Sequence, residues 1–184
     1  YFKSLKKNEK FGKISHANAT VRWNRNQEYY DQAPWRGTKK YDGGVLMNQA
    51  IHNLDILLWL MGDIEEVFSY DATRLRDIET EDVSLGLVKF KDGSLGVIEA
   101  ATTIYPRNYE ESISVFGEKG TMKVGGTNAL NIEHAVFEDE DEKSVELKKM
   151  EIEKDPLGVP GHQCIVENLV DSIMNNKEPE VSGE

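Results

Sequence analysis

The chain has 184 residues, 39% of them hydrophobic and 30% charged, a composition typical of one soluble globular domain. Its net charge of −11 argues against binding to nucleic acid or to an anionic membrane surface, because both attract Lys and Arg. The longest apolar run, residues 56–61, is too short for a membrane helix of about 20 residues, and the single cysteine fits a cytoplasmic protein without disulfides.

The first half of the chain predicts a strand, a long loop and a helix. Residues 14–23 alternate between apolar and polar side chains, which is typical of a strand with one buried face. No period holds over residues 24–40, a polar and aromatic stretch whose length is typical of a functional loop. Residues 42–62 are apolar on most sides, which predicts a buried helix that ends at Gly62.

The second half predicts a sheet followed by a helix. Strands are expected at residues 66–71, 82–90, 94–102, 111–116, 120–124, 129–137 and 144–147. Turn signals at residues 91–94 and 117–120 favour antiparallel pairing of the strands that flank them. The acidic run at residues 138–142 predicts a solvated loop or hairpin tip. Residues 162–174 predict a last helix. The expected fold class is therefore α+β, an open and mostly antiparallel sheet with helices packed on one face.

The helix of residues 42–62 carries a polar stripe. Asn48, His52 and Asp55 follow each other at i, i+4 and i+7 and so share one face. A buried polar group must be paired or used, so His52 is either a satisfied core histidine or a general base acting on a hydroxyl. His52 and Asp55 could also reach one metal ion, but two ligands make a weak site, and no metal is expected.

The loop before this helix offers candidate ligand contacts. Tyr30, Trp35 and Arg36 precede Gly43 and Gly44, which allow close approach to the helix N-terminus. Aromatic rings, a guanidinium and a positive helix end suit an anionic or sugar-like ligand, although Trp35 and Arg36 could equally pack on the sheet edge. His162 either faces the same cleft or helps to cap the last helix. No G-x-G-x-x-G follows a strand, so no cofactor-binding residue is expected in this chain.

Several of these segments resemble the GFO/IDH/MocA oxidoreductases, the relatives of glucose–fructose oxidoreductase and inositol dehydrogenase. The most specific resemblance is residues 43–55, GGVLMNQAIHNLD, followed by WLMG at residues 59–62. Residues 9–14, the Trp35-Arg36-Gly37 element, residues 116–120 and residues 162–179 resemble other parts of the same second domain. The resemblance thus covers nearly the whole chain.

The resemblance implies that residues 1–184 form the α+β substrate-binding and oligomerisation domain of a two-domain enzyme. The Rossmann domain that binds NAD or NADP, with the catalytic lysine, would be absent from this chain. The family's catalytic histidine corresponds to His52. The position one turn earlier is often aspartate but is Asn48 here, as in members resembling UDP-N-acetylglucosamine-uronate 3-dehydrogenases.

We therefore expect an NAD(P)-dependent dehydrogenase that oxidises a hydroxyl of a sugar, nucleotide-sugar or cyclitol. His52 would accept or relay the proton, Asn48 would assist it, and Tyr30, Trp35, Arg36, Asp55 and His162 would contact the substrate. Its partners would be its own N-terminal Rossmann domain and further copies of itself through the sheet face, and the fragment alone would be inactive. Two alternatives remain: a non-catalytic binding or assembly module on the same scaffold, and an NAD-dependent lyase or glycosidase.

Overall fold

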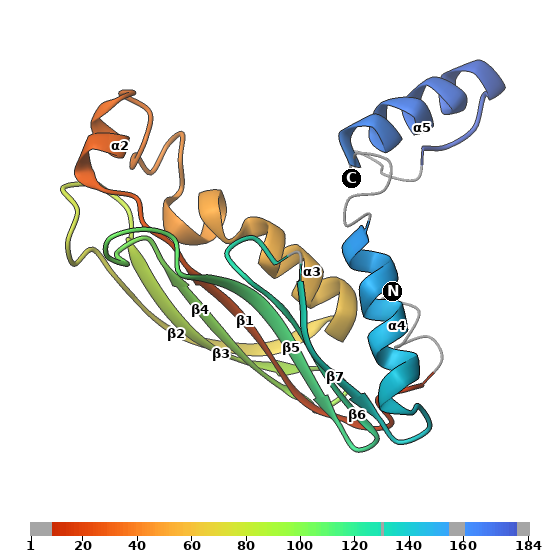
Figure 1. Ribbon diagram of the computed structural model, residues 1–184. Helices are drawn as coiled ribbons and strands as arrows, with labels where there is room; N and C mark the ends of the chain where they lie inside the picture. Colours follow the sequence, from red (N-terminus) through yellow and green to blue (C-terminus); the bar gives the residue numbers. More distant parts are fainter. Residues whose placement is uncertain (1–8, 130, 155–160, 180–184) are drawn as a thin grey trace. The chain divides into compact units, whose positions relative to one another are not determined.

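A computed structural model describes residues 9–129, 131–154 and 161–179 of the chain (Figure 1). The chain divides into two compact units, residues 1–146 and residues 147–184. The first unit holds the whole sheet and every predicted site residue except His162. None of the described helices is both long and apolar enough to cross a membrane.

The sheet of the first unit has seven strands in the order β2-β3-β4-β1-β5-β6-β7. The strands are β1 Ile14–Arg22, β2 Ile64–Ala72, β3 Val83–Phe90, β4 Leu95–Ala101, β5 Glu110–Gly117, β6 Gly120–Gly125 and β7 Asn131–Phe137. Strand β1 lies in the middle, parallel to β4 and antiparallel to β5, and every other pair is antiparallel. This confirms the predicted fold class, whereas the two meanders joined through a central β1 were not foreseen.

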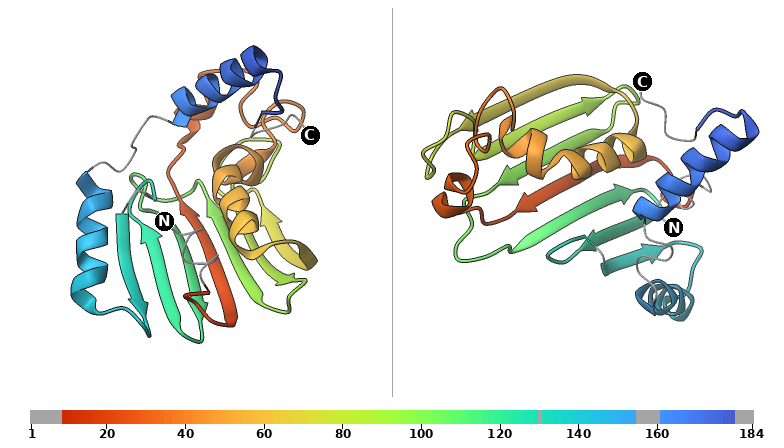
Figure 2. Two further views of the ribbon diagram at one scale, coloured as in Figure 1. Left: turned by 90° about the vertical axis from the view of Figure 1, so that its right-hand side faces the viewer. Right: turned by 90° about the horizontal axis from the view of Figure 1, so that it is seen from above.

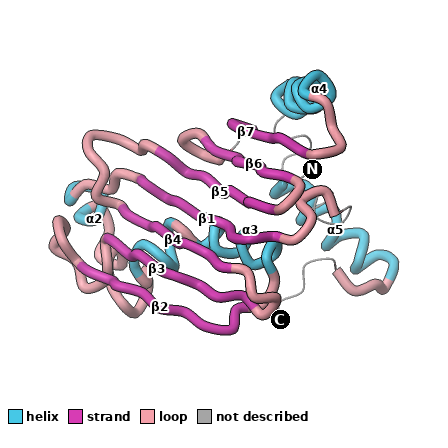
Figure 3. The backbone as a smooth tube through the Cα atoms, turned by 90° about the horizontal axis from the view of Figure 1, so that it is seen from below, coloured by secondary structure: helices cyan, strands magenta, loops and turns pink. Residues whose placement is uncertain are grey.

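One face of the sheet is covered by a helix in two segments, the π-helical η1 Val45–Gln49 and α3 Ile51–Met61 (Figure 2). Side chains from alternate β1 positions, such as Ala19 and Val21, are buried on this face, and Val21 packs with Val45 and Ala50 in the core. The period of two in β1 therefore builds the floor on which the helix lies. Seen from below, the sheet lies in front of α3 (Figure 3).

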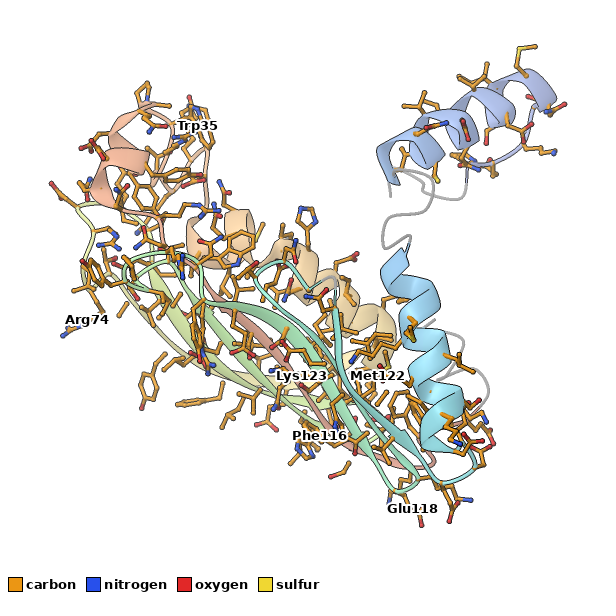
Figure 4. The ribbon with its side chains drawn as sticks, in the orientation of Figure 1. Trp35, Arg74, Phe116, Glu118, Met122 and Lys123 are labelled. Carbon is orange, nitrogen blue, oxygen red and sulfur yellow. The ribbon has the colours of Figure 1, made fainter. Side chains whose placement is uncertain are left out.

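The opposite face of the sheet is uncovered within the first unit. At the end of β1 this face carries Arg22, which forms ion pairs with Glu99 at 2.5 Å and Glu110 at 2.6 Å. To one side of β1, the strands β2, β3 and β4 expose six apolar side chains on the same face, namely Phe68, Tyr70, Leu85, Leu87, Leu95 and Val97. We call these six residues the open-face patch. Figure 4 shows Phe116 on the same side of the sheet, away from α3.

Two predictions about local structure were wrong. Residues 144–147 lie in helix α4 Glu142–Lys154, not in a strand, because a four-residue apolar alternation cannot distinguish the two. The predicted loop contains the short helix α2 Gln27–Asp31, capped by Asn26, whose side chain accepts the Tyr29 N–H. The acidic run is mostly a solvated loop between β7 and α4, the first of its two predicted forms. Its Asp139 pairs with Lys10 at 2.6 Å.

The second unit contains α5 Gly161–Asn175, which confirms the predicted last helix. Within the described part of this unit, the apolar side chains of Ile165, Leu169 and Ile173 are exposed. An amphipathic helix with an exposed apolar stripe needs another surface to cover it.

Candidate functional site

The helix that carries His52 begins with a glycine and a widened turn. Gly44 has φ 82°, a left-handed conformation that favours glycine, and the Ala50 N–H bonds to the Val45 carbonyl in an i to i−5 pattern. The Glu81 carboxylate accepts the Leu46 N–H at 3.1 Å. The positive helix end expected to attract an anionic ligand is thus already occupied by a carboxylate of the chain itself.

The polar stripe is not buried as the sequence predicted. His52 and Asp55 are exposed and Asn48 is only partly buried. The buried polar residues of this helix are Gln49 and Asn53, and Asn53 donates to the Thr20 carbonyl on β1 at 3.5 Å. The outer side of the helix also exposes apolar residues, including 53% of Trp59. The sequence predicted that this apolar helix is buried on all sides, but in the first unit only the side that faces the sheet is covered.

Asn48 is held by a hydrogen-bond network that reaches back into the loop. Its amide donates to Asp42, which also accepts the Gly37 N–H at 2.5 Å. The Gln49 amide donates to the Asn48 side-chain oxygen at 2.7 Å and to the Tyr29 hydroxyl at 3.4 Å. Both functional atoms of the Asn48 amide are therefore fixed, one turn before His52.

Tyr29 belongs to an alternating stack of aromatic rings and guanidinium groups. The Arg25 guanidinium lies 4.8 Å from the Trp23 ring centre and 5.2 Å from that of Tyr29. The Arg36 guanidinium lies 4.1 Å from the Tyr29 ring and 5.5 Å from the Trp35 ring, with Trp35 in the loop beside α2 (Figure 4). The order is thus Trp23, Arg25, Tyr29, Arg36, Trp35, a geometry that favours cations over ring faces.

We name these five residues the arginine–aromatic stack. Three of its donors, Trp23 Nε1, Arg25 Nε and Arg36 Nε, are buried and have no hydrogen-bond partner among the described residues. An unsatisfied buried donor costs about 1–3 kcal/mol, and native structures contain few of them. Three such unpaired donors in one stack indicate a surface where hydrogen-bond acceptors of a bound ligand could pair with them.

The predicted contact residues occupy different surroundings. Arg36 donates from Nη1 to the Tyr29 carbonyl at 2.7 Å, and Trp35 is exposed. Tyr30 is buried, and its hydroxyl shares a 3.1 Å hydrogen bond with Thr102. Burial raises the pKa of Tyr30, so its hydroxyl remains protonated at neutral pH. Tyr30 and Arg36 both line a cavity of about 280 Å³ between α2 and residues 77–79.

His162 lies in α5 of the second unit, and its side chain is outside the described residues. Among the residues that the structure does describe, no three His, Cys, Asp or Glu side chains are grouped so that they could hold a metal ion. What the first unit assembles is an exposed imidazole, a fixed amide and a row of guanidiniums. Such a set can accept a proton and bind hydroxyl or acidic groups.

Sequence reasoning missed Arg25 and Gln49, and it left Tyr29 out of the predicted contact residues. Tyr30 was preferred over Tyr29, but the short helix α2 turns Tyr30 into the core. An alternation of arginine and aromatic residues at 23, 25, 29, 35 and 36 was the available signal, but its meaning depends on the fold of the loop.

Relatives with known structures share this fold. The WlbA dehydrogenase of Chromobacterium violaceum, solved with NADH and UDP-GlcNAcA, is 39% identical with a TM-score of 0.86 over 98% of this chain and 50% of that chain. The WlbA dehydrogenase of Bordetella pertussis, solved with the same two molecules, is 36% identical with a TM-score of 0.85 and covers 98% and 51% of the two chains.

A curated relative is the myo-inositol 2-dehydrogenase of Thermotoga maritima, 35% identical over 90 residues, which are 45% of this chain and 26% of that protein. This chain therefore spans about half the length of the two WlbA structures. Its match to the inositol enzyme covers about a quarter of that protein. The family model for the GFO/IDH/MocA C-terminal domain matches residues 1–123. The match extends over well more than half of the 184 residues, and the chain belongs to the GFO/IDH/MocA C-terminal domain family.

Proposed function

We propose that this chain is the substrate-binding half of an NAD(P)-dependent dehydrogenase that oxidises a hydroxyl of an acidic nucleotide-sugar. The observation that carries the proposal is the placement of His52, exposed and one turn after an amide fixed to the arginine–aromatic stack. The relatives solved with NADH and UDP-GlcNAcA support the choice of an acidic substrate.

In this proposal His52 accepts the proton of the substrate hydroxyl, and Asn48 orients a neighbouring hydroxyl. A nicotinamide cofactor, when bound, supplies the acceptor for the hydride. That cofactor would be held by a Rossmann domain outside this chain, and the exposed Trp59 side of α3 would lie against it. The isolated chain should accordingly show no binding of NAD by calorimetry.

Replacement of His52 tests the catalytic role. In the full-length protein, with UDP-GlcNAcA and NAD as probes, His52→Ala should lower kcat by about 100- to 10,000-fold, the usual contribution of a general base. His16→Ala is the matched control, because His16 lies on β1 and stacks on Phe116 at the uncovered face of the sheet. A His52→Ala protein that folds and keeps its kcat would exclude the role.

Arg36 tests the acidic nature of the substrate. Arg36→Lys keeps the charge but loses the planar fork, so KM for UDP-GlcNAcA should rise roughly tenfold while kcat changes little. The control is Arg74→Lys, whose exposed side chain lies away from the stack (Figure 4). An equal KM effect in both variants, or none in Arg36→Lys, would contradict an acidic ligand at the stack.

We also propose that a second copy of the protein covers the open-face patch. The patch consists of six exposed apolar side chains on three neighbouring strands, and a contiguous apolar surface of this kind is typical of a protein interface.

A further inference from the structure

One acidic side chain on the helix-covered side of the sheet has no role in the site described so far. Glu111 on β5 is paired with Val21 of β1, and side chains of paired residues point to the same face of a sheet. Val21 packs against Val45 and Ala50, so Glu111 also projects to the side of η1 and α3.

Glu111 is exceptional in its surroundings. Strands β1, β4 and β5, all of whose residues the structure describes, direct only one charged residue to the helix side, and that residue is Glu111. The others at alternating positions are Ala17, Ala19, Val21, Gly96, Ile98, Ala100, Ile113 and Val115. A carboxylate among such neighbours loses hydration, which is costly unless another group compensates.

No described side chain donates a hydrogen bond to the Glu111 carboxylate or forms an ion pair with it, although its backbone N–H bonds to the Gly126 carbonyl at 2.7 Å. Burial raises the pKa of Glu111, and the charge of His52 acts in the opposite direction. Helix α3 is fixed over the sheet at this level, because Asn53 donates to the Thr20 carbonyl. Thr20 is paired with Ser112, the neighbour of Glu111, so Asn53 anchors the turn of α3 that carries His52 over the segment of β5 that carries Glu111.

The adjacent residue gives the contrast. Glu110 projects to the uncovered face, where Arg22 pairs with it at 2.6 Å, Lys123 pairs with it at 2.9 Å and Ser112 donates to it at 2.7 Å. Glu110 is thus a satisfied member of an ion network. Two neighbouring glutamates of one strand have opposite environments, and only Glu111 lacks a structural partner.

We propose that Glu111 is a positioning residue for His52, its carboxylate stabilising the imidazolium that forms when His52 accepts the substrate proton. In that step the substrate O–H bond breaks and an N–H bond forms on the imidazole, so a positive charge appears beside a prepared negative one. The inference rests on the proposed function of His52. The other titratable groups close to His52 along this helix are Asp55 of α3 and Asp42, which accepts the Asn48 amide. Helix η1 itself supplies only the neutral Asn48 and Gln49, and β1 and β4 direct no titratable side chain to the helix side.

The spatial pairing is tested without any assay of activity. The carboxyl carbon of Glu111, assigned with Glu111→Gln, is titrated by NMR in the full-length protein. In His52→Gln the pKa of Glu111 should rise, because a favourable charge is lost, whereas in His16→Gln it should stay as in the wild type. An equal pKa of Glu111 in the wild type and in His52→Gln would overturn the proposal.

Kinetics then test the role. Glu111→Gln should lower kcat/KM for UDP-GlcNAcA by about tenfold or more and move the acid limb of its pH profile to lower pH. Glu110→Gln should leave the pH at half-maximal rate unchanged, and an equal displacement in both variants would overturn the proposal. If His52→Ala keeps full activity while the Glu111 titration still follows His52, the proposed function fails and the pairing stands.

Discussion

The carboxylate of Glu81 lies in the space that a side chain at Gly44 would need. A Cβ atom at Gly44 would overlap with the carboxyl group of Glu81. That carboxylate accepts the Leu46 N–H, and the Glu81 carbonyl accepts the Val45 N–H at 3.1 Å. The glycine before the helix therefore makes room for a cap supplied by Glu81, two residues before β3. This cap fixes the start of the helix that carries Asn48 and His52.

Gly44→Ala should destabilise the protein by about 1–3 kcal/mol, through the strained φ of 82° and the displaced cap. The free energy of unfolding in urea measures this. Gly93→Ala is a matched control, because Gly93 has φ 84° but no atom within 4 Å of the added Cβ. Equal losses in the two variants would show that backbone strain alone accounts for Gly44.

Asp82 should be a strong determinant of stability. Its carboxylate is fully buried and accepts the backbone N–H groups of Arg74, Leu75 and Arg76 at 2.8, 2.8 and 2.9 Å. Asp82→Asn keeps the shape but loses the charge and one acceptor, which should cost about 2–3 kcal/mol. The exposed Asp77 lies in the same loop, and Asp77→Asn should change the midpoint of thermal unfolding little by comparison.

Glu110 and Glu111 should give opposite dependences of stability on pH. Burial opposes the ionisation of Glu110, but hydrogen bonds from Ser112 and Lys123 and the charges of Lys123 and Arg22 outweigh it and lower its pKa from 4.5. The folded state then binds fewer protons than the unfolded one. The stabilisation by Glu110 is present above pH 4.5 and is lost as the pH falls through the folded pKa.

Glu111 has the reverse sign. Burial raises its pKa above 4.5, so the folded state holds its proton longer, and stability falls as the pH rises from 4.5 through the folded pKa. The loss of unfolding free energy caused by Glu110→Gln should therefore grow as the pH rises toward about 4.5. In the wild type the unfolding free energy should decline above about pH 4.5 because of Glu111, and Glu111→Gln should remove that decline. Urea unfolding at a series of pH values measures both, and two curves of the same sign would contradict the assignment of faces.

The sequence contained the fold class but not the surroundings of the site. Alternation in residues 14–23 and the Asp92-Gly93 turn are local signals, and β1 and the β3–β4 hairpin follow them. The helix was also found, yet its buried side was misassigned, because Leu and Ile side chains on both sides hide which one meets the sheet. The burial of Asn53 between α3 and β1 and the inward direction of the Tyr30 side chain from α2 became clear only from the fold.

The remaining site residues depend on contacts between distant segments. Glu81 meets the helix start beside Gly44, and Glu111 faces the helix side of the sheet because β5 pairs with β1, which places Glu111 opposite Val21. A single sequence carries no periodic signal for such pairings. Short-range patterns therefore predicted His52 and Asn48 as site residues, and the strand pairing was needed to propose Glu111 beside them.

Phe68 and Val67 offer a direct test of assembly through the open-face patch. They are neighbours on β2, each 57% exposed, but they point to opposite faces: Phe68 is paired with the exposed Leu87 and Val67 with the buried Val88. Phe68→Glu should place a charge in an apolar interface and shift the full-length protein to a smaller oligomer in analytical ultracentrifugation. Val67→Glu adds the same charge on the same strand and should leave the sedimentation unchanged. A protein that stays assembled with Phe68→Glu, or that dissociates equally with Val67→Glu, would place the contact between copies somewhere other than the open-face patch.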